Sequence, residues 1–166
     1  MGLETIDIIL VEPKYAGNVG AIARSAKNYG VRSIKIVGDI DFLCLEAKKM
    51  ALYGYPLLEQ AARFTTLDEA LKTNSLAIDT VHQSRFNRKS LKPPWQVFEN
   101  LSRRLATEPT ALVFGREANG LTREEINLCH FLTIIPTDKN LSFNLAHSVT
   151  VFLYEAYRST TGKEKP

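Results

Sequence analysis

Three residues near the amino terminus have types and a spacing that could bind an anion. Asn18, Gly20 and Arg24 follow an apolar run at residues 6–11 and stand where the sequence takes on helical spacing. A strand, a loop with glycine and a helix N-terminus together form a common site for a phosphate or a nucleotide. The spacing matches neither the dinucleotide-binding motif nor the phosphate-binding loop, so a site here would be of another kind.

Arg24 is predicted to point away from the protein core. The apolar stripe of a helix over residues 18–29 would consist of Val19, Ile22, Ala23 and Ala26. Arg24 falls on the opposite side, where Gly20 would clear space one turn before it, and Gly30 is expected to end the helix. A guanidinium in this place could bind a phosphate, although an ordinary exposed arginine is the simpler interpretation of this helix alone.

A second candidate loop follows another apolar strand. The strand ends at Phe114, and Gly115, Glu117 and Gly120 come directly after it. Ligands of open α/β sheets bind beyond the carboxyl ends of the strands. The missing side chain of Gly115 would let a ligand approach the backbone, but glycine is also common at strand ends that bind nothing.

A third candidate loop contains Ser142 and Asn144, between a strand that closes at Pro136 and a long helix that continues to Arg158. The apolar residues of this helix cover an arc of roughly 140°. They are Leu145, Ala146, Val149, Phe152, Leu153, Ala156 and Tyr157. One face of a sheet is too small to bury all of them, so we expect a second subunit to cover part of the arc. Other helices of the same chain are the alternative.

One segment of the chain is strongly basic. Residues 82–92 hold Arg85, Arg88, Lys89 and Lys92 and no acidic residue. Such a loop could run along a phosphate backbone, whereas on charge alone a solvated surface loop is the simpler interpretation. The formal net charge of the whole chain is only +3, which permits contact with nucleic acid without requiring it.

The candidate residues need a sheet that brings the strand ends together, and the sequence predicts one. Apolar runs typical of strands occur at residues 6–10, 33–37, 75–79, 110–114 and 132–136, with helical patterns between them at 18–29, 42–52, 67–72 and 95–106. This alternation indicates an α/β fold with a mostly parallel sheet covered by helices on both faces. Trp95 should lie on the core stripe of its helix or at an interface. We expect a single domain over residues 1–160 and a flexible tail at 161–166.

The composition is that of an ordinary globular protein. Of 166 residues, 45% are hydrophobic and 23% are charged. No apolar stretch approaches the roughly 20 residues of a membrane helix, and the first ten residues do not read as a secretion signal. Cys44 and Cys129 lie far apart without the spacing of metal ligands, so reduced thiols and a cytoplasmic location are expected.

Taken together, the three candidate loops resemble motifs of the SPOUT methyltransferases, within them the SpoU/TrmH group. Residues 18–24 match N-x-G-x-x-x-R, and residues 113–121 match V-F-G-x-E-x-x-G-L. Residues 142–144 match S-L-N, with Phe143 in place of leucine, and the helix after them ends in the Y-E of residues 154–155. The motifs keep the order of the family, and the similarity extends from about residue 5 to residue 158.

The resemblance implies a SPOUT fold, in which the C-terminal part of the sheet is tied in a trefoil knot. Members form homodimers through their knots, and the knotted loops bind S-adenosylmethionine without a metal. Carried over by position, the cofactor-binding residues would be Thr80, Val81, His82, Gly115, Glu117, Ile135, Leu141, Ser142 and Phe143. Glu117 would tie the loops to neighbouring backbone rather than transfer a proton.

The reaction that the resemblance implies is methyl transfer to a ribose 2′-hydroxyl of RNA. This hydroxyl is a poor nucleophile and must be brought in line with the methyl group on the sulfonium. Arg24 would reach the substrate phosphate or the 2′-oxygen, at an active site completed across the dimer interface. Because arginine is essentially always protonated, it would orient the phosphate and stabilise developing charge. Asn18 would fix the loop, and Ser142 and Asn144 would orient the ribose and its phosphate.

The expected partner is tRNA, with rRNA as a second option. The first two motifs are most similar to those of family members that methylate a pyrimidine at position 32 of the anticodon loop, and Arg85, Arg88 and Lys89 would bind phosphates. Two alternatives stay open. One is an inactive knotted RNA-binding protein, because Phe143 could obstruct the cofactor. The other is a flavodoxin-like or sugar-phosphate-binding α/β protein, against which the intact motifs argue.

Overall fold

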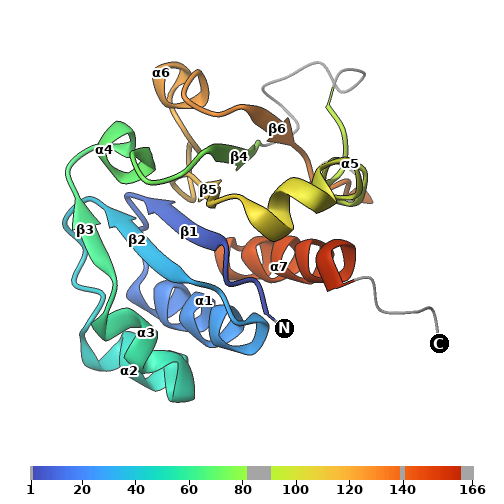
Figure 1. Ribbon diagram of the computed structural model, residues 1–166. Helices are drawn as coiled ribbons and strands as arrows, with labels where there is room; N and C mark the ends of the chain where they lie inside the picture. The colour runs from blue at the N-terminus through green and yellow to red at the C-terminus, as the bar shows by residue number, and fades with distance from the viewer. Residues whose placement is uncertain (1, 82–90, 139–140, 162–166) are drawn as a thin grey trace.

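A six-stranded sheet forms the centre of the computed structural model, which describes residues 2–81, 91–138 and 141–161 (Figure 1). The strands are β1 (Ile6–Val11), β2 (Ser33–Val37), β3 (Ala62–Phe64), β4 (Leu76–Thr80), β5 (Thr110–Phe114) and β6 (Phe131–Thr133). Their order is β3-β2-β1-β5-β4-β6, and every neighbouring pair is parallel. The parallel sheet and five of its strands are therefore confirmed. Edge strand β3 was missed because its three residues contain no buried position to reveal it.

The helices cover both faces of the sheet, as predicted. They are α1 (Ala16–Tyr29), α2 (Leu45–Ala51), the 3-10 helix η1 (Leu52–Gly54), α3 (Tyr55–Glu59), α4 (Leu67–Leu71), α5 (Pro94–Thr107), α6 (Arg123–Ile126) and α7 (Leu145–Thr161). α1, α5 and α7 pack on one face, and α4 lies on the other, with residues of α6 against its apolar layer (Figure 1). The helix expected over residues 42–52 is shorter at both ends, because Cys44 before α2 is extended and Leu52 ends α2 with a φ of 48°.

Helix α1 carries the first motif and confirms its expected C-terminus. Gly30 has a φ of 66°, the left-handed conformation that glycine adopts at the end of a helix. The expected role of Gly20 was wrong, because this residue is buried. A Cβ added at Gly20 would lie 2.2 Å from the carbonyl oxygen of Ala47. Glycine at this position therefore lets α2 pack directly on α1 instead of clearing space beside Arg24.

Helix α7 buries its apolar arc within its own chain. The side chains of α1 and α5 cover it together with the sheet, so for this arc the alternative to a second subunit holds. Phe152 packs edge to face against Phe98 of α5 and Phe114 of β5, with ring centroids 5.6 and 5.3 Å apart. Tyr154, outside the arc, stays 53% exposed.

Helix α5 shows one error in the predicted core. Phe98, Leu101 and Leu105 are buried as expected. Trp95 is 42% exposed, and Pro94 and Val97 take the buried positions in the first turn. Trp95 is therefore not in the core, because the stripe is shifted by one residue at the N-terminus of the helix, and its expected alternative place at an interface stays a prediction.

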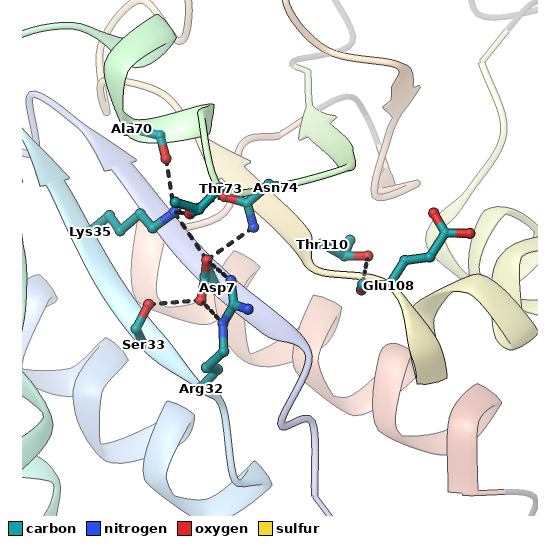
Figure 2. Close-up of polar contacts among 9 residues, drawn as sticks. All are labelled: Asp7, Arg32, Ser33, Lys35, Ala70, Thr73, Asn74, Glu108 and Thr110. Carbon is teal, nitrogen blue, oxygen red and sulfur yellow. Dashed lines mark hydrogen bonds and ion pairs between the residues drawn. The ribbon is translucent and has the colours of Figure 1, made fainter.

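A buried ionic network stabilises the sheet at the N-terminal ends of β1 and β2 (Figure 2). Asp7 of β1 is fully buried and accepts hydrogen bonds from Arg32, Ser33 and Asn74 at 2.7–2.9 Å. The Lys35 ammonium lies 3.0 Å from the same carboxylate and donates to the Ala70 carbonyl, the Thr73 hydroxyl and the Asn74 amide oxygen at 2.7–2.8 Å. Burial raises the pKa of Asp7, but these donors outweigh it and lower the value to about 2. The network joins β1 and β2 to the segment that follows α4.

Within the described part of the chain, no helix is both long and apolar enough to cross a membrane. The trefoil knot stays a prediction.

Candidate active site

The carboxyl ends of β1 and β5 lie next to each other at the centre of the sheet. The strand order continues outward from this pair, through β2 and β3 on one side and through β4 and β6 on the other. Ligands of open parallel sheets bind at such a switch point. The loop after β1 leads into the first motif on α1, and the loop after β5 carries the second motif, so these two motifs lie where a ligand is expected.

A chain of hydrogen bonds joins all three motifs. Glu117, after β5, accepts hydrogen bonds from the backbone N–H of Lys14 at 2.9 Å and from the side-chain amide of Asn18 at 3.2 Å. The Asn18 amide oxygen in turn accepts one from the Asn144 amide at 3.0 Å. The Asn144 oxygen caps the start of α7 by accepting from the N–H of Ala146 at 2.8 Å. Both oxygens of Glu117 thus hold the loops together, which is the tie expected of this residue.

A pocket of about 390 Å³ opens among these loops. Its wall contains eight of the nine residues that the sequence assigned to the cofactor: Thr80, Val81, Gly115, Glu117, Ile135, Leu141, Ser142 and Phe143. The ninth, His82, lies outside the described residues. Phe143 is 46% exposed and forms part of the wall while the pocket stays open.

Gly115 lines this pocket for a reason that the sequence analysis did not give. A Cβ added there would lie 2.3 Å from the carbonyl carbon of Gly120 and 2.4 Å from the backbone nitrogen of Leu121. The loop folds back over Gly115 because Arg116 and Gly120 exchange two backbone hydrogen bonds, of 2.8 and 3.3 Å. The glycine therefore makes room for its own loop, and the expected approach of a ligand to its backbone is not needed to explain it.

Arg116 is a structural residue of the site that the sequence analysis missed. Its guanidinium forms paired hydrogen bonds with the carboxylates of Glu12, at 2.7 and 2.8 Å, and of Glu125, at 2.9 and 3.1 Å. These partners raise the pKa of Arg116. Glu12 directly follows β1 and has a φ of 45°, in the left-handed region. Arg116 thus ties the loop after β1 to α6, and only its place inside the second motif could have indicated it.

Arg24 lines a second hollow, of about 730 Å³, together with Asn18 and Asn144. Three of the four residues predicted to be catalytic therefore meet here, and the fourth, Ser142, lines the smaller pocket. The two cavities adjoin along the chain, since neighbouring residues 143 and 144 line one cavity each. His147, one turn after Asn144 on α7, also lines the hollow and was missed; its helical spacing from Asn144 was the available signal.

The predicted RNA-binding residues Arg85, Arg88 and Lys89 lie outside the described residues. Lys92, the last residue of the basic segment, is described and exposed. Its carbonyl accepts a hydrogen bond from the Thr133 hydroxyl at 2.9 Å, at the end of β6. Lys92 therefore lies beside the strand that precedes the third motif.

Asp79, directly before Thr80 of the pocket wall, is expected to destabilise the fold at neutral pH. Its side chain is 1% exposed, and neither oxygen has a hydrogen-bond partner among the described residues. Burial raises the pKa of Asp79 well above its usual value and outweighs the opposing effect of the nearby Thr80 backbone N–H, which does not have the geometry of a hydrogen bond. Each unit of raised pKa costs about 1.4 kcal/mol of folding free energy once the unfolded chain is ionised. We therefore expect Asp79→Asn to raise the urea midpoint at pH 7.

The stability gained by Asp79→Asn should depend on pH in a direction that can be predicted. Between the unfolded and folded pKa values of Asp79 the folded state binds the extra proton, so stability falls as pH rises. The gain from Asp79→Asn should therefore shrink as pH is lowered to about 4. Asp68→Asn, an exposed carboxylate on α4, serves as the control. Equal midpoints for wild type and Asp79→Asn at pH 7 would contradict a buried, unpaired acid.

Known proteins are similar to this chain in sequence and in fold. Residues 5–154 match the SpoU rRNA Methylase family. The tRNA (cytidine-2'-O-)-methyltransferase TrmJ of Methanocaldococcus jannaschii is 40% identical over 92% of this chain and 67% of its own length. The tRNA (cytidine/uridine-2'-O-)-methyltransferase TrmJ of Yersinia pestis is 34% identical over 92% of this chain and 60% of its own. The chain thus spans about two thirds of these relatives.

Solved structures agree with this assignment. TrmJ from Z. mobilis superimposes with a TM-score of 0.80 at 26% identity, over 96% of this chain and 72% of that one. The SpoU methyltransferase AviRb from Streptomyces viridochromogenes, solved in complex with the cofactor AdoMet, gives a TM-score of 0.75 at 23% identity, over 95% and 61%. The motifs, the fold and the matched length together place this chain in the SpoU methylase family.

Proposed function

We propose that this protein is an S-adenosylmethionine-dependent 2′-O-methyltransferase that acts on a pyrimidine ribose of the tRNA anticodon loop, at position 32. The observation that carries the proposal is the hydrogen-bonded chain from Asn144 through Asn18 to Glu117, which brings the three motifs around one pocket. The similarity to two TrmJ enzymes supports tRNA as the substrate. The name of the matching family makes rRNA the second candidate.

The pocket fits the cofactor that the family implies. Its volume of about 390 Å³ lies within the range of pockets that hold small organic ligands, roughly 300–1,000 Å³. Val81, Ile134, Ile135, Leu141 and Phe143 supply an apolar lining. Backbone groups of the three loops would recognise polar edges of the ligand. The cofactor, when bound, supplies a methyl group on a positively charged sulfur, which leaves readily without a metal.

The protein's own residues would position and stabilise the reacting ribose. Arg24 is exposed in the hollow, where a guanidinium can bind the substrate phosphate through two parallel hydrogen bonds. Asn18 and Asn144 fix each other by their shared hydrogen bond, so the first turn of α1, which precedes Arg24, is already held in place before substrate binds. Ser142 lines the pocket and would orient the ribose from the cofactor side.

A homodimer with a trefoil knot belongs to the same proposal. Several large apolar side chains stay exposed on and beside α1, α2 and η1, namely Tyr15, Leu43, Leu45, Met50 and Leu52. Large apolar side chains exposed near one another can mark a protein interface. A partner seated there would border the hollow that holds Arg24, which supports the completion of the active site across a dimer interface. A cytoplasmic location follows from the proposed substrate.

Methylation of tRNA with labelled S-adenosylmethionine tests the proposal. Transcripts incubated with the protein should gain a single 2′-O-methyl mark at position 32, located by partial alkaline hydrolysis, and a transcript with 2′-deoxyribose at that position should gain none. A mark at another tRNA position, or on rRNA alone, would overturn the proposed substrate. No transfer to any RNA would overturn the proposed activity.

The inactive RNA-binding alternative is separated by cofactor affinity. Phe143 lines the pocket without filling it, so we expect isothermal titration to detect binding of S-adenosylmethionine. Phe143→Leu restores the residue usual in the family and should change this affinity only modestly. If S-adenosylmethionine does not bind to the wild-type protein but binds to Phe143→Leu, this result would support the inactive alternative.

A further inference from the structure

Arg24 lies over an aromatic ring that the three motifs do not include. The Cζ atom of Arg24 is 5.7 Å from the centroid of the Tyr53 ring, within the range of a cation–π contact. Tyr53 belongs to η1, which packs on α1, and is 53% exposed. The ring therefore supports one side of a guanidinium that otherwise faces the hollow.

The Tyr53 side chain is itself held against α1. Its hydroxyl donates a hydrogen bond of 2.8 Å to the side-chain oxygen of Asn28. Asn28 comes one helical turn after Arg24, so the two residues share a face of α1. The Arg24 guanidinium, and after it Asn28, lowers the pKa of the Tyr53 hydroxyl. Tyr53 thus contacts both residues, the first with its ring and the second with its hydroxyl.

The backbone around Tyr53 is built for this contact. Leu52, with a φ of 48°, ends α2 and starts the 3-10 turn that carries Tyr53. Gly54 follows Tyr53 directly. A Cβ added to Gly54 would lie 2.5 Å from the Ala23 carbonyl oxygen and 2.7 Å from the backbone nitrogen of Arg24. Only glycine permits this approach, and it brings the backbone of η1 against the residue that Tyr53 supports.

We propose that Tyr53 is a positioning residue for Arg24 in methyl transfer. Arginine has a long and flexible side chain, and holding it in one place before the substrate binds lowers the entropic cost of the transition state. The ring restricts the guanidinium, which has five N–H donors and therefore keeps donors available for a phosphate or a ribose oxygen. The proposal rests on the proposed function, and it adds a residue on η1 to the machinery.

Replacing Tyr53 by leucine tests the role. We expect Tyr53→Leu to lower kcat roughly fivefold, the effect of losing an exposed cation–π contact. The affinity for S-adenosylmethionine should be unchanged, because Tyr53 does not line the cofactor pocket. Tyr53→Phe keeps the ring and should retain most of the activity. In an Arg24→Ala background, Tyr53→Leu should cause no further loss, since the two residues act as one unit.

Tyr55 provides a matched control. It lies two residues further along, its ring contacts Lys48 at 5.1 Å in place of Arg24, and its hydroxyl donates to the Leu43 carbonyl at 3.2 Å. It therefore shares with Tyr53 a cation near the ring and a hydrogen-bonded hydroxyl, although it is more buried than Tyr53. Tyr55→Leu should therefore leave kcat within about twofold. A loss of kcat in Tyr55→Leu equal to that in Tyr53→Leu, or an additive loss in the Arg24→Ala background, would overturn the proposal.

A spectroscopic measurement tests the contact without using activity. The Tyr53 ring should shift the side-chain proton resonances of Arg24 upfield in the wild-type NMR spectrum, and Tyr53→Leu should abolish that shift while Tyr55→Leu keeps it. An unshifted Arg24 would overturn the positioning role even in an active enzyme. A shifted Arg24 in a protein without methyl transfer would instead contradict the proposed function and leave the Arg24–Tyr53 contact established.

Discussion

Replacing Arg24 by alanine is expected to reduce methyl transfer to tRNA by about 100- to 1,000-fold, the usual effect of removing one charged donor from a preorganised site. The residue is exposed on α1 and lines the hollow, and none of its atoms is needed by the core. Folding and the affinity for S-adenosylmethionine should therefore stay close to those of the wild type. Single-turnover kinetics with labelled cofactor and thermal unfolding measure the two sides of this prediction.

Lys27 is the control for Arg24→Ala. It is an exposed cation one turn further along the same helix and does not line the hollow. Lys27→Ala should keep nearly full activity, which separates a local role from a general loss of positive charge. Arg24→Lys keeps the charge but loses the planar pair of donors, so its rate should fall between those of wild type and alanine. Near-normal turnover in Arg24→Ala would remove Arg24 from the mechanism.

The meeting of the three motifs could be predicted because each belongs to a strand end or a helix start of a parallel sheet. Apolar runs reveal buried strands, and parallel strands place their carboxyl ends at one edge. The family resemblance then identified the pocket wall, and eight of the nine predicted cofactor residues line one cavity. Periodicity could not show why Gly20 and Gly115 are glycines. Gly20 packs against the backbone of α2, and Gly115 packs against its own loop, which folds back over it.

Side-chain partners were beyond the reach of the sequence for a related reason. Arg116 meets Glu12 across 104 positions, and Asp7 meets Asn74 across 67. A helix was expected over residues 42–52 and no role was predicted for Tyr53, whereas in the structure Leu52 ends α2 and the following turn brings Tyr53 to Arg24. A single left-handed residue thus decides which side chain supports the guanidinium, and no apolar pattern marks it.

The buried network around Asp7 leads to the second large effect. Asp7→Asn should lower the free energy of unfolding by about 3–5 kcal/mol, because it leaves the Lys35 ammonium buried without its counter-charge. Lys35 has 8% of its side chain exposed, so solvent cannot replace the lost carboxylate. For a domain of this size the change corresponds to a fall in Tm of roughly 6–20 °C. Urea unfolding at pH 7 measures it directly.

The pH dependence separates loss of charge from loss of packing. The folded pKa of Asp7 is about 2, below the usual value of 3.8, so its contribution is complete above pH 4 and disappears as pH falls toward 2. The difference in stability between wild type and Asp7→Asn should therefore narrow over this range, because the protonated acid and the amide are then alike in shape and charge. Asp39→Asn, at an exposed carboxylate, should change stability by less than about 0.5 kcal/mol at any pH. A difference for Asp7→Asn that is constant with pH would mean that packing, rather than the buried charge pair, holds β1 to β2 and to the segment after α4.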